Sequence, residues 1–201
     1  GPGRQCFIAL DVAASELVLD DGRYSLPKDN AVLSASELID TYQEWVRIYP
    51  IVSIEDGMAE DDWAGWTEST RRLGDRVQLV GDDLYTTSPA LIRRGIELQA
   101  SNAVLIKLNQ IGTVTETLEA VRTAKQVGWG TVISHRSGET EDVTIVHLGV
   151  GWKIPQLKVG SLTRGERTAK WNEGLRIADA IAGPGGGDGP LPPASIFPWG
   201  R

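Results

Sequence analysis

Six short apolar runs recur along the chain, and each ends in a polar residue that is capable of chemistry. Short apolar runs that alternate with helical segments are typical of buried parallel strands in a β/α fold. The strands of a β/α barrel deliver their last residues to one common rim. We therefore expect the six polar residues to converge in space; they are Asp11, Glu55, Asp82, Lys107, His135 and Lys158.

The segments between the runs predict helices, so the chain divides into strand–helix units. Strands are expected to end at Asp11-Val12 and to cover 51–55, 77–81, 103–107, 131–134 and 156–158. Helices are expected over 35–49, behind a capping box of Ser34 and Glu37, and over about 61–73, from 88 onward, 113–127, about 141–149 and about 166–182. The segment LVLDDGRYSL predicts a hairpin that turns at Asp21-Gly22.

The number of units limits how complete the barrel can be. A closed barrel of this type has eight strands, and only about six βα units are evident. The sequence therefore predicts an α/β fold that is a partial (β/α)8 TIM-type barrel, with an N-terminal segment missing. We expect residues 1–182 to form this barrel domain and residues 183–201, which are rich in Gly and Pro, to be a disordered tail.

Composition narrows the classes of function. The net charge is −7 and no basic run is present, which argues against nucleic-acid binding. A single cysteine, Cys6, excludes an internal disulfide, and its place in the first apolar run predicts a buried thiol. No apolar stretch approaches the roughly 18 residues that span a bilayer, and nothing resembles a signal peptide. A cytoplasmic location is therefore expected.

Three of the rim residues are carboxylates on successive strands. Asp11, Glu55 and Asp82 offer the oxygen ligands that Mg²⁺ prefers, and no cysteine or paired histidine favours zinc. Any one of them taken singly is more readily explained as a solvated residue at the end of a strand. Asp56 and Asp83 are expected to lie beside this site, where either can orient a ligand or the lysine opposite.

The other rim residues are basic. Lys107 ends the apolar run AVLI, where burial beside other cations would lower its pKa and allow it to act as a general base. The alternative is a lysine whose stem is buried and whose ammonium reaches water. Arg136, Ser137 and Lys158 can clamp a phosphate, and His135 precedes them in the polar run SHRSGETED.

Six segments of the chain also resemble one family in that family's own order. The segment VLIKLNQIGTVTET is similar to the signature of the enolases. So are ALDVAASE, SIEDG with EDDW, LVGDDL, SHRSGETED and LKVGSLTRGERTAKWN, and the resemblance runs from about Phe7 to Ile181. It implies a phosphopyruvate hydratase, a carbon–oxygen lyase of glycolysis and gluconeogenesis. Such an enzyme interconverts 2-phosphoglycerate and phosphoenolpyruvate with Mg²⁺, and it assembles as a dimer or larger homo-oligomer.

The resemblance also assigns roles to residues. It implies that Asp11, Glu55 and Asp82 hold Mg²⁺ and that Lys107 removes the proton alpha to the substrate carboxylate. The residues expected to contact substrate are His135, Arg136, Ser137 and Lys158, together with Glu55 and Asp82.

The sequence departs from the family in three respects. The family's N-terminal domain, mobile serine-bearing loop, early barrel strands and acid glutamate have no counterpart here. Bulky residues at 152–155 and Val159 replace the small residues and the threonine that are usual around Lys158.

Two hypotheses follow: the chain is the C-terminal part of an enolase, with little activity of its own, or it is a non-catalytic domain that binds a metal or a partner. Another lyase or racemase of the superfamily is disfavoured, because those often place their base in Lys-x-Lys.

Overall fold

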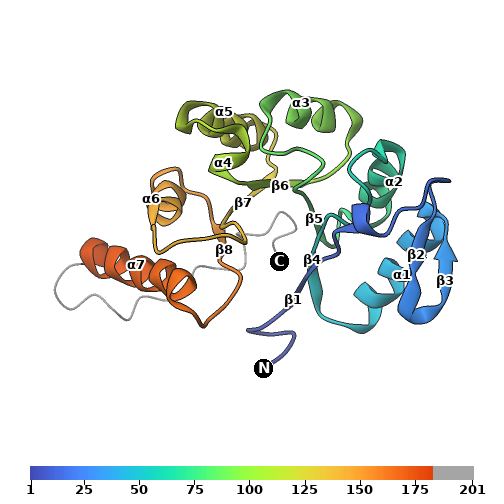
Figure 1. Ribbon diagram of the computed structural model, residues 1–201, viewed down its shortest axis with the longest axis horizontal. Coiled ribbons are helices and arrows are strands. Elements are labelled where there is room, and N and C mark those ends of the chain that lie inside the picture. Colours follow the sequence, from blue (N-terminus) through green and yellow to red (C-terminus); the bar gives the residue numbers. More distant parts are fainter. Residues whose placement is uncertain (183–201) are drawn as a thin grey trace.

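A curved sheet of six parallel strands is the centre of the computed structural model, which describes residues 1–182 (Figure 1). Each strand pairs with the next one along the sheet, in the order β1-β4-β5-β6-β7-β8. The strands are β1 (Ile8–Asp11), β4 (Ile51–Glu55), β5 (Gln78–Gly81), β6 (Ala103–Ile106), β7 (Gly130–Ser134) and β8 (Gln156–Lys158). Their positions confirm the expected partial barrel, and the predicted tail at 183–201 lies outside the described residues.

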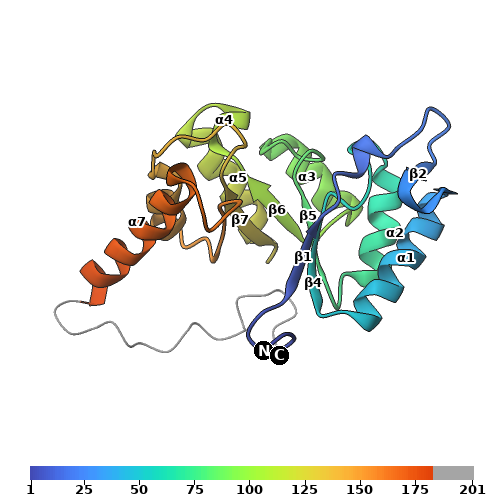
Figure 2. The ribbon, with the colours of Figure 1, turned by 60° about the horizontal axis from the view of Figure 1, so that its bottom comes forward.

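Helices cover the convex side of the sheet and leave its concave side open (Figures 1 and 2). They are α1 (Ala35–Ile48), α2 (Trp63–Leu73), α3 (Pro89–Leu98), α4 (Leu108–Ile111), α5 (Val114–Gln126), α6 (Thr144–Gly151) and α7 (Gly165–Ala182). The capping box at the start of α1 is confirmed, because the Ser34 and Glu37 side chains each accept a hydrogen bond from the other's amide. Within residues 1–182, every helix is too short or too polar to cross a membrane.

Successive residues of the central strands face opposite sides of the sheet. On β6, Val104 and Ile106 point outward into the large core beneath the helices, where Trp66 is 1% exposed. Ala103 and Leu105 point inward and pack with Val80 and Val132 in a small cluster inside the half-barrel. This alternation is the side-chain pattern of a barrel strand buried on both faces.

The first edge of the sheet is exposed, which corrects the prediction for Cys6. Cys6 is exposed rather than buried, and Phe7 and Ile8 are 46% and 38% exposed. The physical reason is that β1 begins only at Ile8 and, among the described residues, pairs with β4 alone. A strand with a neighbour on one side leaves its other edge uncovered.

The predicted reversal at Asp21-Gly22 is present, and a second hairpin that was not predicted follows it. The antiparallel ladder joins β2 (Tyr24–Leu26) to β3 (Ala31–Leu33) through a short 3-10 helix, η2 (Pro27–Asp29). Around Asp21-Gly22, Val18 forms an antiparallel bridge with Tyr24, the Leu19 amide donates to the Arg23 carbonyl at 2.7 Å, and the Ser25 amide donates to the Leu17 carbonyl at 2.8 Å. Pro27 opens the 3-10 turn and Asn30 ends it with φ 50°, a left-handed conformation that asparagine tolerates. The chain therefore reverses a second time after Leu26.

The loop side chain of Asn102 ties β5 to the start of β6. Its amide oxygen accepts a hydrogen bond from the Leu79 amide at 2.7 Å, and its amide nitrogen donates to the carbonyls of Gly74 and Val77 at 3.0 Å each.

We predict that Asn102→Ala lowers the free energy of unfolding by about 2–3 kcal/mol, because it leaves partly buried backbone groups without partners. Urea unfolding followed by circular dichroism measures this change. Asn172→Ala is the matched control, since Asn172 is exposed on α7, and it should change stability by less than about 0.5 kcal/mol. Equal effects of the two substitutions would contradict the role assigned to Asn102.

Candidate active site

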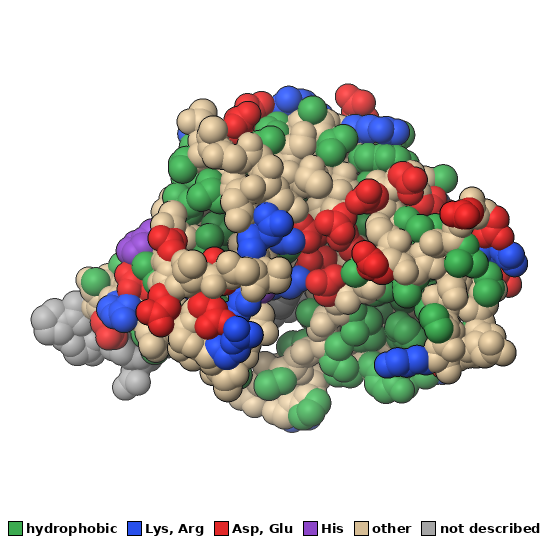
Figure 3. All heavy atoms as spheres, viewed as in Figure 1, with side chains coloured by type: hydrophobic (Ala, Val, Ile, Leu, Met, Phe, Trp, Pro, Cys, Tyr) green, Lys and Arg blue, Asp and Glu red, His purple; other side chains and the backbone are tan. Residues whose placement is uncertain are grey.

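The six predicted residues lie at the carboxyl ends of the six strands. Asp11, Glu55 and Lys158 are the last residues of their strands, and the other three come directly after β5, β6 and β7. Because parallel strands present their carboxyl ends at the same edge, the structure places all six at one rim. Figure 3 shows acidic side chains gathered near the middle of one face, next to Lys and Arg side chains.

Lys158 joins two of the carboxylates across the mouth of the half-barrel. Its ammonium donates to Asp11 Oδ2 at 2.8 Å and to Glu55 Oε1 at 2.7 Å. Burial disfavours the charged amine, but the hydrogen bonds to Asp11 and Glu55 outweigh burial and raise the pKa of Lys158. This contact spans the gap between β8 and the strands β1 and β4, which are far from it in the sheet order.

Glu55 is a buried carboxylate at the end of β4. It is 7% exposed, and burial raises its pKa to about 7. Lys158 opposes this shift, whereas the nearby carboxylates of Asp11 and Asp82 add to it. The positive charge of Lys158 does not fully offset the effect of burial on Glu55. A cation bound beside Glu55 would therefore favour its ionised form.

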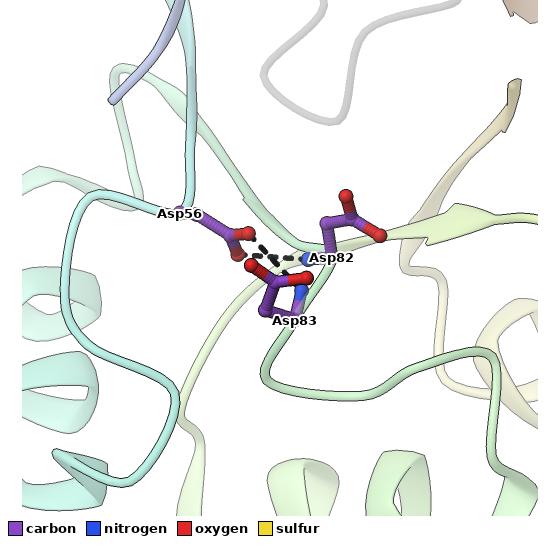
Figure 4. A group of neighbouring side chains, drawn as sticks. All are labelled: Asp56, Asp82 and Asp83. Carbon is purple, nitrogen blue, oxygen red and sulfur yellow. Dashed lines mark hydrogen bonds between the residues drawn. The ribbon is translucent and has the colours of Figure 1, made fainter. Parts of the chain in front are cut away.

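Asp56 holds the end of β5 in place (Figure 4). Its carboxylate accepts hydrogen bonds from the amides of Asp82 at 2.9 Å and Asp83 at 3.0 Å. Burial raises the pKa of Asp56 to about 7, although the two amides favour its ionised form. Of the two roles open to Asp56, the structure shows an anchor that orients the backbone of Asp82.

Among the described residues, one acidic group brings its carboxylate oxygens within 4.8 Å of one another, and it consists of Asp56, Asp82 and Asp83. This group overlaps the predicted trio at Asp82 only. The Lys158 ammonium lies between the carboxylates of Asp11 and Glu55. Asp56 lies close to Asp82 and Asp83 because its two oxygens accept hydrogen bonds from their amides. Asp56 therefore supports the backbone of its neighbours, and metal binding by Asp11, Glu55 and Asp82 stays a prediction.

Lys107 contacts a carboxylate, whereas the sequence predicted other cations beside it. Its ammonium forms an ion pair with Asp82, and the Lys107 side chain is 16% exposed. Two neighbours that the sequence argument missed complete this network. Gln110, on α4, donates to Asp82 Oδ1 at 3.1 Å, and the Thr87 hydroxyl accepts from the Lys107 amide at 2.9 Å. Gln110 could have been predicted as a neighbour of Lys107, because side chains three residues apart lie one helical turn from each other.

The segment 135–137 forms the opposite side of the rim. Arg136 donates to Asn109 Oδ1 at 2.9 Å, which links the loop after β7 to α4, and Ser137 is exposed. Burial lowers the pKa of His135, and the cations of Arg167 and Lys158 lower it further. Nδ1 of His135 lies 2.7 Å from the carbonyl oxygen of Arg136 and 2.5 Å from Nη1 of Arg167, so both neighbours hold the ring in place.

The rim has a carboxylate half and a cationic half, and ion pairs of Lys107 and Lys158 join the two. Carboxylates from three strands suit a hard divalent cation such as Mg²⁺, which prefers oxygen ligands and keeps positions for water and substrate. Two lysines and an arginine on the neighbouring strand ends suit an anionic substrate. Lys107 lies on the boundary between the two halves, where an amine can exchange a proton with a bound molecule.

Comparison with known proteins agrees with this arrangement. A family model described as "Enolase, C-terminal TIM barrel domain" matches residues 1–189. A protein named enolase from Bdellovibrio bacteriovorus is 52% identical over 184 residues, which cover 92% of this chain and 43% of that relative. The chain thus spans less than half the length of the relative. It belongs to the enolase family, within the part described as the C-terminal TIM barrel domain.

Proposed function

We propose that the protein containing this chain catalyses the Mg²⁺-dependent, reversible dehydration of 2-phosphoglycerate to phosphoenolpyruvate. The observation that supports this most strongly is the convergence of three carboxylates, two lysines and a His-Arg-Ser segment at one rim of a family barrel. A lysine base together with one or two Mg²⁺ ions is the general pattern of the enolase superfamily. The cytoplasmic location and the homo-oligomer remain predictions.

The proposed metal ligands are Asp11, Glu55 and Asp82. Their chemistry fits, because all three offer oxygen and because Glu55 is buried with a pKa raised to about 7. When bound, the metal ion supplies positive charge next to the substrate carboxylate and so makes the adjacent C–H more acidic. Lys158, which now bridges Asp11 and Glu55, is assigned to the substrate carboxylate.

Lys107 is the proposed general base. It accepts the proton alpha to the carboxylate at Nζ, for which its ammonium must first lose a proton. The Asp82 carboxylate and the Thr87 hydroxyl fix the side chain and the backbone of Lys107. Arg136 and Ser137 are assigned to the phosphate, where the guanidinium can form paired charge-assisted hydrogen bonds, and His135 lies beside them.

A second function, binding without catalysis, is favoured by one observation. The concave side of the half-barrel is open, with a cavity of about 410 Å³ that includes Asp11, Glu55 and Lys158 in its lining. An open site retains ligands but admits water, which weakens electrostatic stabilisation of a developing charge. For the 201 residues alone we therefore propose metal affinity with little or no turnover.

We predict that Mg²⁺ binding to the chain weakens at least about tenfold in Glu55→Gln, because the substitution removes one charged oxygen ligand. Isothermal titration calorimetry with MgCl₂ measures the affinity. Asp75→Asn is the matched control, since Asp75 is exposed and outside the rim, and its affinity should equal that of the wild type. Unchanged binding in Glu55→Gln would remove this residue from the proposed ligand set.

We predict that Lys107→Ala lowers kcat of the whole protein by about 10²- to 10⁴-fold, the usual contribution of a positioned acid or base. Formation of phosphoenolpyruvate from 2-phosphoglycerate, followed by absorbance, provides the measurement. Lys28→Ala removes an exposed lysine and should retain full activity. Activity of Lys107→Ala within a factor of three of the wild type would rule out Lys107 as the base. Turnover by the 201-residue chain alone would contradict the separate expectation that this chain has little or no activity.

A further inference from the structure

Two cations of α7 are buried and have no part in the mechanism above. Arg167 is 7% exposed and Lys170 is 0% exposed, and they lie one turn apart on the inner face of the helix. A buried charge is costly unless hydrogen bonds or opposite charges compensate it. The partners of these two side chains therefore indicate what they stabilise.

The Arg167 guanidinium binds the backbone of the segment after β7. Nη1 donates to the carbonyl of Arg136 at 3.0 Å and Nη2 donates to the carbonyl of Ser137 at 3.0 Å. Nη1 also contacts Nδ1 of His135 and, at 3.4 Å, the carbonyl of Val159 after β8. One planar side chain thus contacts all three residues of the segment 135–137.

Lys170 fixes the same loop a few residues further along. Its ammonium donates to the carbonyl of Thr140 and to that of Glu166, the latter at 2.8 Å, and lies 3.5 Å from Glu139 Oε2. The two cations together hold both ends of the segment 135–140 against α7.

This segment depends on side chains because its own backbone provides little support. The His135 amide donates to the carbonyl of Lys158 at 3.0 Å. In the part of the chain that the structure describes, no further backbone–backbone hydrogen bond joins residues 136–141 to another segment. The carbonyls of Arg136 and Ser137 are therefore fixed by Arg167, and without it their orientation would be free to change.

The ring of His135 is confined from the other side as well. Gly160 has φ +89°, and a Cβ at that position would lie 2.7 Å from Nε2 of His135. A side chain there would have to displace the ring. His135 thus lies between Gly160, after β8, and the Arg167 guanidinium on α7, and the two confine the position of the ring.

We propose that Arg167, assisted by Lys170, is a positioning residue that holds residues 135–137 in the orientation in which they bind the phosphate of the substrate. This inference rests on the proposed function, which assigns that segment to the phosphate. Arginine suits the position because its fork donates in one plane to acceptors on several residues, whereas a lysine ammonium acts as a point charge. Arg167 contacts the backbone of the loop, so its proposed effect on the substrate is indirect.

The test compares Arg167→Met with Arg72→Met in the whole polypeptide that contains this sequence. Arg72 is a matched control, because its side chain is 15% exposed and it also crosses between elements, from α2 to Asp40 and Gln43 on α1. Both substitutions should reduce stability, and only the first should affect the loop. The variant Arg167→Lys keeps the charge and serves if Arg167→Met does not fold.

The first readout is independent of function and uses ¹⁵N relaxation at the amides of Arg136 and Ser137. Rigid backbone gives order parameters of about 0.85 and flexible backbone gives values below about 0.6. We expect Arg167→Met to move both amides from the rigid to the flexible range, Arg167→Lys to move Ser137, and Arg72→Met to leave both rigid. Amides that stay rigid in both Arg167 variants would overturn the proposal.

The second readout is the affinity for inorganic phosphate, measured by calorimetry. We expect it to fall by about tenfold in Arg167→Met and to be unchanged in Arg72→Met. A fall in affinity with rigid loop amides would show that Arg167 acts through its charge and would overturn positioning. A wild-type protein that binds neither phosphate nor 2-phosphoglycerate would contradict the proposed function instead, and the relaxation data would still decide whether Arg167 orders the loop.

Discussion

Parallel pairing of six strands in chain order is the constraint on which the rest of the structure depends. It brings residues separated by up to 147 positions, such as Asp11 and Lys158, into hydrogen-bonding contact at 2.8 Å. Since all six strands of this sheet run in the same direction, each adds one of the predicted site residues to the same rim. The helices outside supply the apolar burial, and the rim is free to carry charge.

The rim balances its charges through ion pairs between its two halves. Lys158 pairs with Asp11 and Glu55, and Lys107 pairs with Asp82, so each predicted metal ligand contacts a lysine. Burial nevertheless raises the pKa of Glu55 to about 7, which indicates that the compensation is incomplete. Carboxylates whose charge is only partly compensated, with lysines beside them, suit a site that accepts a cation together with an anionic substrate.

Local patterns predicted most of the fold, and contacts between distant segments account for what they missed. Apolar runs and the Ser34–Glu37 capping box gave the strands and the start of α1, because both signals are contained in a few consecutive residues. The exposure of Cys6 depends on β1 pairing, within residues 1–182, with β4 alone, and the partner of Lys107 depends on where β5 ends. Arg167 contacts the carbonyls of Arg136, Ser137 and Val159, which are at least eight residues away in the sequence. Patterns of short spacing do not predict such contacts.

We propose that Lys107 removes the proton alpha to the substrate carboxylate at a metal site formed by the rim. The most direct test is deuterium exchange at C2 of 2-phosphoglycerate in D₂O, followed by NMR, since this step requires the base but not loss of hydroxide. We predict Mg²⁺-dependent exchange by the whole protein and its loss in Lys107→Ala. Exchange that persists in Lys107→Ala, or that is absent from the wild type with Mg²⁺ present, would contradict the account.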